Sequence, residues 1–155
     1  MNEQAILRRI DFLISEARSE SRVKDQAVIY IMRTISNYCT IDQDAPSSVI
    51  KKQNKRMSKG AYKSRKQLPP KEWVKGTNTI NEHQDPLKYI WKWILDNKNV
   101  SREEVLARFR KWPMVTVTSE ENKRLRKCLE TRPRERYREA KIIVGQLKGK
   151  IWEPL

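Results

Sequence analysis

The sequence DPLKYIWKWILDNKNVSREEVLARFRKWPMVTVT, residues 85–118, carries the strongest indications of secondary structure in this chain of 155 residues. Its first part predicts a helix, because Asp85 suits the N-cap, Pro86 suits the first helical position, and apolar residues recur at helical spacing. These apolar residues are Leu87, Ile90, Trp91 and Ile94. The polar residues 97–99 are expected to end the helix.

A second helix is expected in the same stretch. Ser101 and Glu104 form a capping box at its start, and Pro113 closes it. The two helices and their short connection fit a helix-turn-helix, although an ordinary helical pair in a core is the simpler alternative. In a helix-turn-helix, the basic residues presented to nucleic acid would be Arg102, Arg108 and Lys111. Residues 114–118 alternate and are β-branched, which predicts one short strand.

The flanking sequence also favours helices. Towards the N-terminus, apolar residues at helical spacing predict helices over residues 6–17 and 23–38, joined by a short polar connection as in a helical hairpin. Towards the C-terminus, Thr118 and Glu121 form a second capping box, which predicts a helix over residues 119–130.

The last part of the chain predicts one more helix, over residues 134–147. The end, residues 148–155, is expected to be extended, with Ile151 and Trp152 packed against the body of the protein. The scarcity of glycine, with four residues, argues against a turn-rich all-β fold.

These elements predict a mainly α fold, a compact helical domain of about five or six helices with one short β-strand region and a basic arm. Residues 1–45 are expected to form an N-terminal helical hairpin, residues 46–76 a basic arm or linker, and residues 77–155 a C-terminal helical domain. The hairpin and the C-terminal domain are expected to pack as one unit.

Charge is distributed unevenly along the chain. Residues 51–75 contain ten Lys or Arg and one acidic residue, a net charge of +9, whereas the whole chain has a net charge of +15. The net charge is −1 over residues 1–50, zero over residues 76–122 and +7 over residues 123–155. Because potentials add where charges lie within the Debye length, about 10 Å, such clusters favour a ligand with closely spaced negative charges. A nucleic-acid backbone is such a ligand.

The segment 51–75 is the first candidate surface. Its lysines and arginines would contact phosphates, and Tyr62 and Trp73 would stack on bases. The alternative is a solvated arm without a specific ligand. The residues expected to bind nucleic acid here are Lys51, Lys52, Lys55, Arg56, Lys59, Tyr62, Lys63, Arg65, Lys66, Trp73 and Lys75.

The second candidate surface is the Arg-rich segment 123–138, which would flank a groove together with the first. Arg suits bidentate contacts with phosphate better than Lys does. The alternative is a set of ion pairs on helix surfaces, because Glu130, Glu135 and Glu139 are interleaved. The residues expected to bind nucleic acid here are Lys123, Arg124, Arg126, Lys127, Arg132, Arg134, Arg136 and Arg138.

A metal-dependent nuclease is the catalytic alternative. The order of Glu82, His83 and Asn97 is loosely similar to that of HNH-type nucleases, in which a His general base lies beside a metal ligand. His83 is the only histidine of the chain, so no second histidine is available as a ligand, and a surface or capping role for it is the simpler alternative. We therefore expect no catalytic residue, no metal site and no cofactor.

Other classes of protein are less compatible with the sequence. Two cysteines, Cys39 and Cys128, are too few for a typical secreted disulfide scaffold. Charged residues interrupt the N-terminal region, which argues against a signal peptide, and no apolar run approaches the ~20 residues that span a bilayer. We therefore expect a cytoplasmic protein with free thiols that does not bind membranes.

The sequence thus predicts a small basic protein that binds DNA or RNA through two Lys/Arg-rich surfaces without catalysis. A second possibility is an inhibitor or adaptor from a phage or mobile element, which would bind a protein partner within a nucleoprotein machine. The nuclease is the third. A binding module predicts steep salt dependence, an adaptor predicts weak binding to free nucleic acid, and a nuclease predicts cleavage that requires His83.

Overall fold

The computed structural model describes residues 2–19, 25–43, 45–69, 78–128 and 133–155. These residues form eight helices and a five-stranded mixed sheet. The fold is therefore α/β, and the expectation of a mainly helical domain with five or six helices and one short strand region is wrong. The strands have only three to five residues each, so most of them are too short to produce a recognisable alternation in the sequence.

The chain divides into two compact units, each built from two separate segments. Unit 1 consists of residues 1–45 and 85–113, and unit 2 consists of residues 46–84 and 114–155. The chain therefore passes between the two units three times. Each unit has its own apolar core.

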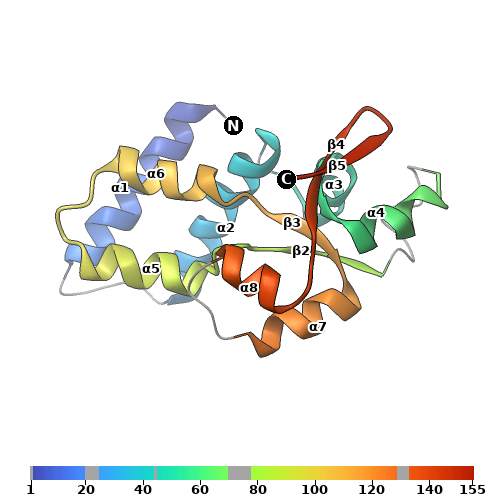
Figure 1. Ribbon diagram of the computed structural model, residues 1–155. Coiled ribbons are helices and arrows are strands. Elements are labelled where there is room, and N and C mark those ends of the chain that lie inside the picture. The colour runs from blue at the N-terminus through green and yellow to red at the C-terminus, as the bar shows by residue number, and fades with distance from the viewer. Residues whose placement is uncertain (1, 20–24, 44, 70–77, 129–132) are drawn as a thin grey trace. The chain divides into compact units, whose positions relative to one another are not determined.

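Unit 1 is a group of four helices (Figure 1): α1 (Glu3–Arg18), α2 (Asp25–Ile41), α5 (Leu87–Asp96) and α6 (Arg102–Lys111). The helices predicted for this half of the chain are confirmed, and so is the capping box of Ser101 at the start of α6. Their apolar stripes meet in one core. Its most buried residues are Ile6, Ile10, Leu13, Val28, Met32, Ile35, Ile90, Ile94, Val105 and Phe109.

Ion pairs join the helices of unit 1 at their polar edges. The guanidinium of Arg102 bonds both carboxylate oxygens of Asp11 on α1. Arg108 Nε lies 2.7 Å from Asp85 Oδ2, and its guanidinium also lies over the ring of Trp93. These pairs link α6 to α1 and to the residues before α5, and they occupy two of the three basic side chains of the supposed helix-turn-helix.

The reactivity of the Cys39 thiol, on α2, tests how closely unit 1 is packed around it. Burial raises the pKa of its thiol to about 12. At pH 8 only about one molecule in ten thousand would then carry the reactive thiolate, against roughly a quarter for an ordinary cysteine. In a Cys128→Ser variant, iodoacetamide is expected to alkylate Cys39 at least about 1,000-fold more slowly in the folded protein than in urea. Mass spectrometry measures both rates, and equal rates would contradict the packing.

Unit 2 contains the sheet, whose strand order is β2-β3-β1-β4-β5. The strands β1 and β3 are parallel, and the other neighbouring pairs are antiparallel. The elements of this unit are α3 (Ser47–Gln53), β1 (Arg56–Ser58), α4 (Lys59–Lys66), β2 (Thr79–Glu82), β3 (Val115–Thr118), α7 (Ser119–Lys127), α8 (Pro133–Glu139), β4 (Val144–Lys148) and β5 (Ile151–Pro154).

One face of the sheet is covered by α7 and α8. Side chains alternate along each strand, so Val115 and Val117 of β3 lie on the same face. Both belong to a core cluster with Leu125 of α7 and Tyr137 of α8. Val144 of β4 packs against the same cluster. In Figure 1, α7 and α8 are drawn in orange and red beside β2 and β3.

The opposite face of the sheet is covered by α3 and α4. Met57 pairs with Thr116 and with Gly145, so these three residues lie on that face. The side chain of Asn81, which pairs with Thr116, donates a hydrogen bond to the carbonyl oxygen of Ser47 at the start of α3. Unit 2 therefore has three layers, with α3 and α4 on one side of the sheet and α7 and α8 on the other.

The C-terminal part of unit 2 differs from the sequence-based expectation. The strand and the capped helix predicted from residue 114 onwards are confirmed by β3 and α7. The helix expected over residues 134–147 ends at Glu139, and its second half forms β4. Lys141, with a φ of +56°, turns the chain out of the helix. Pairing of β4 with β1 and β5 outweighs the helical pattern of residues 140–147.

Candidate nucleic-acid interface

Most of the positive charge belongs to unit 2. Unit 2 contains 21 basic and 8 acidic residues, a net charge of +13, whereas unit 1 contains 13 basic and 11 acidic residues, a net charge of +2. Both basic segments of the sequence, 51–75 and 123–138, fall in unit 2. The field of the excess charge is therefore concentrated on one compact body.

The part of unit 2 from α3 to α4 is basic without acidic neighbours in the sequence. Residues 45–71 contain no Asp or Glu. The exposed residues of α4 are Lys59, Lys63 and Lys66, which follow one another at helical spacing and form one stripe, here called the α4 lysine stripe. Among the ion pairs of the described residues, none involves a lysine of this stripe. Its charge is thus not neutralised by a carboxylate in this part of the chain.

The position of α4 is set at its first turn. The Ser58 Oγ accepts a hydrogen bond from the backbone N–H of Ala61 (2.9 Å) and donates one to Glu121 Oε2 (2.5 Å). Gly60 allows this close approach, because an added Cβ would lie 2.5 Å from Glu121 Oε1. Ala61 is fully buried. The helix therefore lies with one side against the sheet, and the α4 lysine stripe lies on its exposed side.

An aromatic pair lies beside the α4 lysine stripe. Tyr62 of α4 and Trp152 of β5 are both half-buried, with ring centroids 6.0 Å apart and ring planes at 16° to each other. The Trp152 Nε1–H donates to the carbonyl oxygen of Met57 (3.0 Å), and the Tyr62 hydroxyl donates to that of Lys150 (3.3 Å). The indole lies over Gly145, where an added Cβ would be 2.2 Å from Trp152 Cε2. We call this the Tyr62–Trp152 pair.

Trp152 was not among the residues expected to bind nucleic acid, and Lys148 and Lys150 were not either. A hairpin places them: β4 and β5 are joined by Gly149 and Lys150, and Gly149 has a φ of +60°. A glycine with positive φ at the first central position is what a type II′ hairpin turn requires. The sequence LKGKIW, residues 147–152, therefore contained a signal for the hairpin that brings Trp152 back towards α4.

Two of the predicted phosphate ligands are buried. Arg65 of α4 is 1% exposed and Arg136 of α8 is 7% exposed. Burial lowers the pKa of the Arg65 guanidinium to about 10 and also lowers the pKa of Arg56, which is half-buried. Lys51 is half-buried as well. A phosphate could reach Arg65 or Arg136 only if α4 or α8 moved.

The remaining residues of the first segment include Lys52 and Lys55, which are exposed next to β1. Trp73 and Lys75 lie outside the described residues, and so does Arg132 of the second segment.

The Arg-rich segment lies on the other side of the sheet. Its described residues belong to α7 and α8, which pack on the face of the sheet with Val115 and Val117. The first turn of α4 meets α7, where Ser58 Oγ donates to Glu121 Oε2, and the groove between the two segments stays a prediction. Lys123 pairs with Glu120, and Arg124 Nε donates to the carbonyl oxygen of Ala140 (3.0 Å). The exposed basic residues of this side are Lys123, Arg124, Arg126, Lys127, Arg134 and Arg138. Acidic residues are interleaved with them, as in the ion-pair alternative.

Glu82 is enclosed by two partners from α8. Its Oε1 lies 2.7 Å from Arg136 Nη1, and its Oε2 accepts a hydrogen bond of 2.5 Å from the Tyr137 hydroxyl. Burial raises the pKa of Glu82, although Arg136 acts in the opposite direction. Arg136 also donates to the carbonyl oxygens of Leu125 and His83. We call Glu82, Arg136 and Tyr137 the buried charge cluster, and it ties β2 to α8.

The other members of the supposed nuclease site have structural surroundings of their own. Asn97 belongs to unit 1, where its side chain donates to the carbonyl oxygen of Trp93 (2.7 Å) at the end of α5. His83 belongs to unit 2. Within the described part of the chain, no group of three or more His, Cys, Asp or Glu residues could hold a metal ion.

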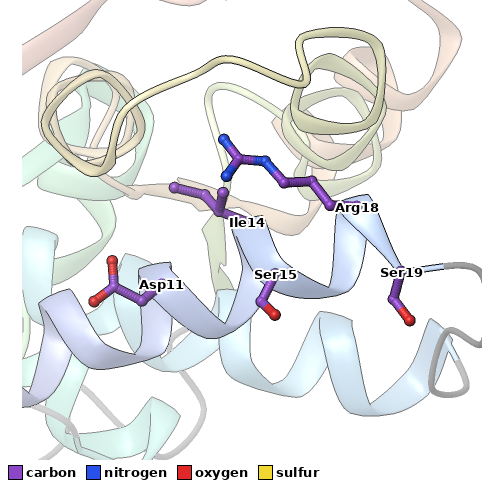
Figure 2. Close-up of a pocket in the computed structure, with 5 residues that line it drawn as sticks. All are labelled: Asp11, Ile14, Ser15, Arg18 and Ser19. Atoms are coloured by element: carbon purple, nitrogen blue, oxygen red, sulfur yellow. The ribbon is translucent and has the colours of Figure 1, made fainter.

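A shallow pocket in unit 1 is the alternative place for a ligand. Figure 2 shows that it runs along the last turns of α1, where Asp11, Ile14, Ser15, Arg18 and Ser19 line it. Its charged groups are already bonded: Asp11 pairs with Arg102, and Arg18 Nε donates to the carbonyl oxygen of Lys98 (2.7 Å). Helix α1 and its C-cap Ser19 supply all five residues, so the pocket lacks the convergent polar groups of a specific site.

None of the described helices combines the length and the apolar character needed to cross a bilayer. Comparison of the chain with protein families, with curated proteins and with solved structures gives no match.

Proposed function

We propose that this protein binds nucleic acid through unit 2, and that the α4 lysine stripe supplies the main phosphate contacts. The concentration of a net charge of +13 in one compact unit is the observation that supports this function most directly. Lysine ammonium groups that replace condensed counterions along a phosphate backbone gain affinity from the release of those ions. The exposed arginines of α7 and α8 would act as a second, weaker surface.

The α4 side is favoured over the α7 and α8 side for two reasons. Residues 45–71, which include α4, contain no acidic residue, whereas Glu120, Glu135 and Glu139 are interleaved on the other side. In addition, Arg136 is part of the buried charge cluster and Lys123 is paired with Glu120. Basic groups that already have a carboxylate partner contribute less to the local potential that a phosphate meets.

A nuclease is a less suitable function for this chain. Glu82 would have to ligate a metal ion or assist a base, yet Arg136 and Tyr137 occupy both of its oxygens. We therefore propose binding without cleavage.

The test is a comparison of two triple variants that remove the same charge. Lys59→Gln/Lys63→Gln/Lys66→Gln removes the α4 lysine stripe, and Lys88→Gln/Lys92→Gln/Lys98→Gln removes three exposed lysines of unit 1. Fluorescence anisotropy with labelled 20-nucleotide single strands and 20-bp duplexes, in 50–500 mM KCl, measures affinity and its salt dependence.

The stripe variant is expected to bind on the order of 100-fold more weakly than the wild type at 0.15 M salt, with a log–log salt slope that is less steep by about 2 to 3. The unit 1 variant is expected to bind like the wild type. Equal losses in the two variants, or wild-type binding that hardly changes with salt, would refute the proposal. Weak wild-type binding to free nucleic acid, with retention on a protein only while that protein carries RNA or DNA, would favour the adaptor instead.

A further inference from the structure

We infer that the nucleic acid bound at this surface is single-stranded, with a base stacked on the Tyr62–Trp152 pair. The inference rests on the proposed function, since it names the class of ligand for the same surface. Tyr62 lies three residues after Lys59 and four before Lys66, so it is next to the α4 lysine stripe on the helix surface.

The pair is a preformed platform. The Trp152 indole is fixed by its hydrogen bond to Met57 and by its close contact with Gly145. Tyr62 stacks on this indole and donates a longer hydrogen bond (3.3 Å) to the carbonyl oxygen of Lys150. Because the polar atoms of both rings are already bonded, what remains for a ligand is aromatic surface. Rings that do not reorganise on binding lose little conformational freedom when a base stacks on them.

This surface suits a single strand better than a duplex. In a duplex the faces of the bases are covered by their stacked neighbours, whereas a single strand can offer a base face to an aromatic ring while its backbone follows basic side chains. The three exposed residues of α4 are all lysines. Of the side chains that read base edges in a duplex groove, Arg, Asn and Gln are absent from the exposed side of α4, and only lysine is present.

One lysine also lies beside the pair on the hairpin side. The backbone of Lys150 accepts the hydrogen bond of Tyr62, so this residue lies directly at the platform, and its side chain is exposed. Lys148, the other hairpin lysine, is paired with Glu153 at 2.5 Å. The strand would therefore pass between the α4 lysine stripe and Lys150, with a base on the rings between them.

The test compares three ligands with the same number of phosphates per strand: a 20-mer of thymidine, a 20-mer in which the central bases are replaced by abasic sites, and a 20-bp duplex. The wild type is expected to bind the thymidine 20-mer at least tenfold more tightly than either of the others in 0.15 M KCl. This comparison needs no variant, so it does not depend on how a substitution affects folding.

Variants then locate the stacking. Tyr62→Leu is expected to weaken binding of the thymidine 20-mer about 5- to 150-fold, with little change in its salt slope or in the affinity for the abasic 20-mer. Tyr62→Phe keeps the ring and is expected to keep the preference for the thymidine 20-mer. Tyr89→Leu, the same change at a half-buried tyrosine of unit 1, is the matched control and is expected to bind like the wild type.

The possible failures are distinguishable. Tight, salt-dependent binding of the duplex that equals or exceeds binding of the thymidine 20-mer would overturn this inference and leave the proposed function standing. Equal loss of all three ligands in Tyr62→Leu, or no loss of any, would also overturn it. Absence of salt-dependent binding to every ligand would overturn the proposed function itself.

Discussion

Glu82→Leu is expected to lower the free energy of unfolding by about 3–5 kcal/mol, because it leaves the charge of Arg136 buried without its partner. Arg136 is 7% exposed, so its guanidinium would stay in the interior of unit 2 without a counter-ion. The change also removes the acceptor of the Tyr137 hydroxyl, which is fully enclosed by the core of unit 2. Urea unfolding followed by circular dichroism measures the loss.

The matched control uses the same pair of charges. Arg136→Met with Glu82→Leu removes both ions together, and the double variant is expected to lie within about 2 kcal/mol of the wild type, since well-packed apolar side chains can replace a buried ion pair. Glu120→Ala breaks the exposed pair with Lys123 and is expected to cost less than about 0.5 kcal/mol. A stable Glu82→Leu protein would contradict the buried charge cluster. If the wild type also cleaved DNA with Mg²⁺ and the variant did not, Glu82 would belong to a catalytic site.

Gly145→Ala is expected to destabilise unit 2 by about 3 kcal/mol, at the upper end of overpacking costs. Its Cβ would lie 2.2 Å from Trp152 Cε2 and 2.4 Å from the carbonyl oxygen of Glu153. The second contact involves the backbone of β5, so a change in side-chain rotamer alone cannot relieve it. The Trp152 indole would be displaced from its position over β4, and the affinity for single-stranded nucleic acid is expected to fall as well.

Gly149 offers the matched control for Gly145. A Cβ at Gly149 would meet nothing within 4 Å, but its φ of +60° makes alanine strained there by about 1–2 kcal/mol. Gly149→Ala is therefore expected to cost less than Gly145→Ala, and Gly149→Asn is expected to cost less still. Thermal unfolding of the three variants gives the order. A Gly145→Ala protein as stable as Gly149→Asn would show that Trp152 does not lie over β4.

The helices of unit 1 were predictable because each has a local cause. Ser101 and Glu104 cap α6, and apolar stripes repeat over two or more turns of α1, α2 and α5. Most strands of unit 2 have no comparable local pattern in the sequence. Strand β1 has three residues, and it forms because Met57 pairs with Thr116 and Gly145, which lie far along the chain. Pairing over that distance leaves no periodic pattern in the sequence.

The candidate site was predictable in part. The charge density of residues 51–75 is visible in the sequence, and so is the helical spacing of Lys59, Lys63 and Lys66. The burial of Arg65 is not, because a long charged side chain is rarely buried and its residue type argues for the surface. The Tyr62–Trp152 pair joins two residues 90 positions apart, which only the hairpin brings together.

The interleaving of the two units has a consequence for the newly made chain. Met57 of β1 leaves the ribosome before Thr116, its partner in β3, and 59 residues separate them. At a translation rate of about 5–20 residues per second, roughly 3–12 s pass between the synthesis of β1 and that of its partner strand β3. During that interval the lysines from residue 51 onwards belong to a strongly basic stretch that still lacks the partner strand β3. Truncated chains that stop before residue 114 would remain in this state, so point variants of the full chain are the appropriate tools for locating its binding surface.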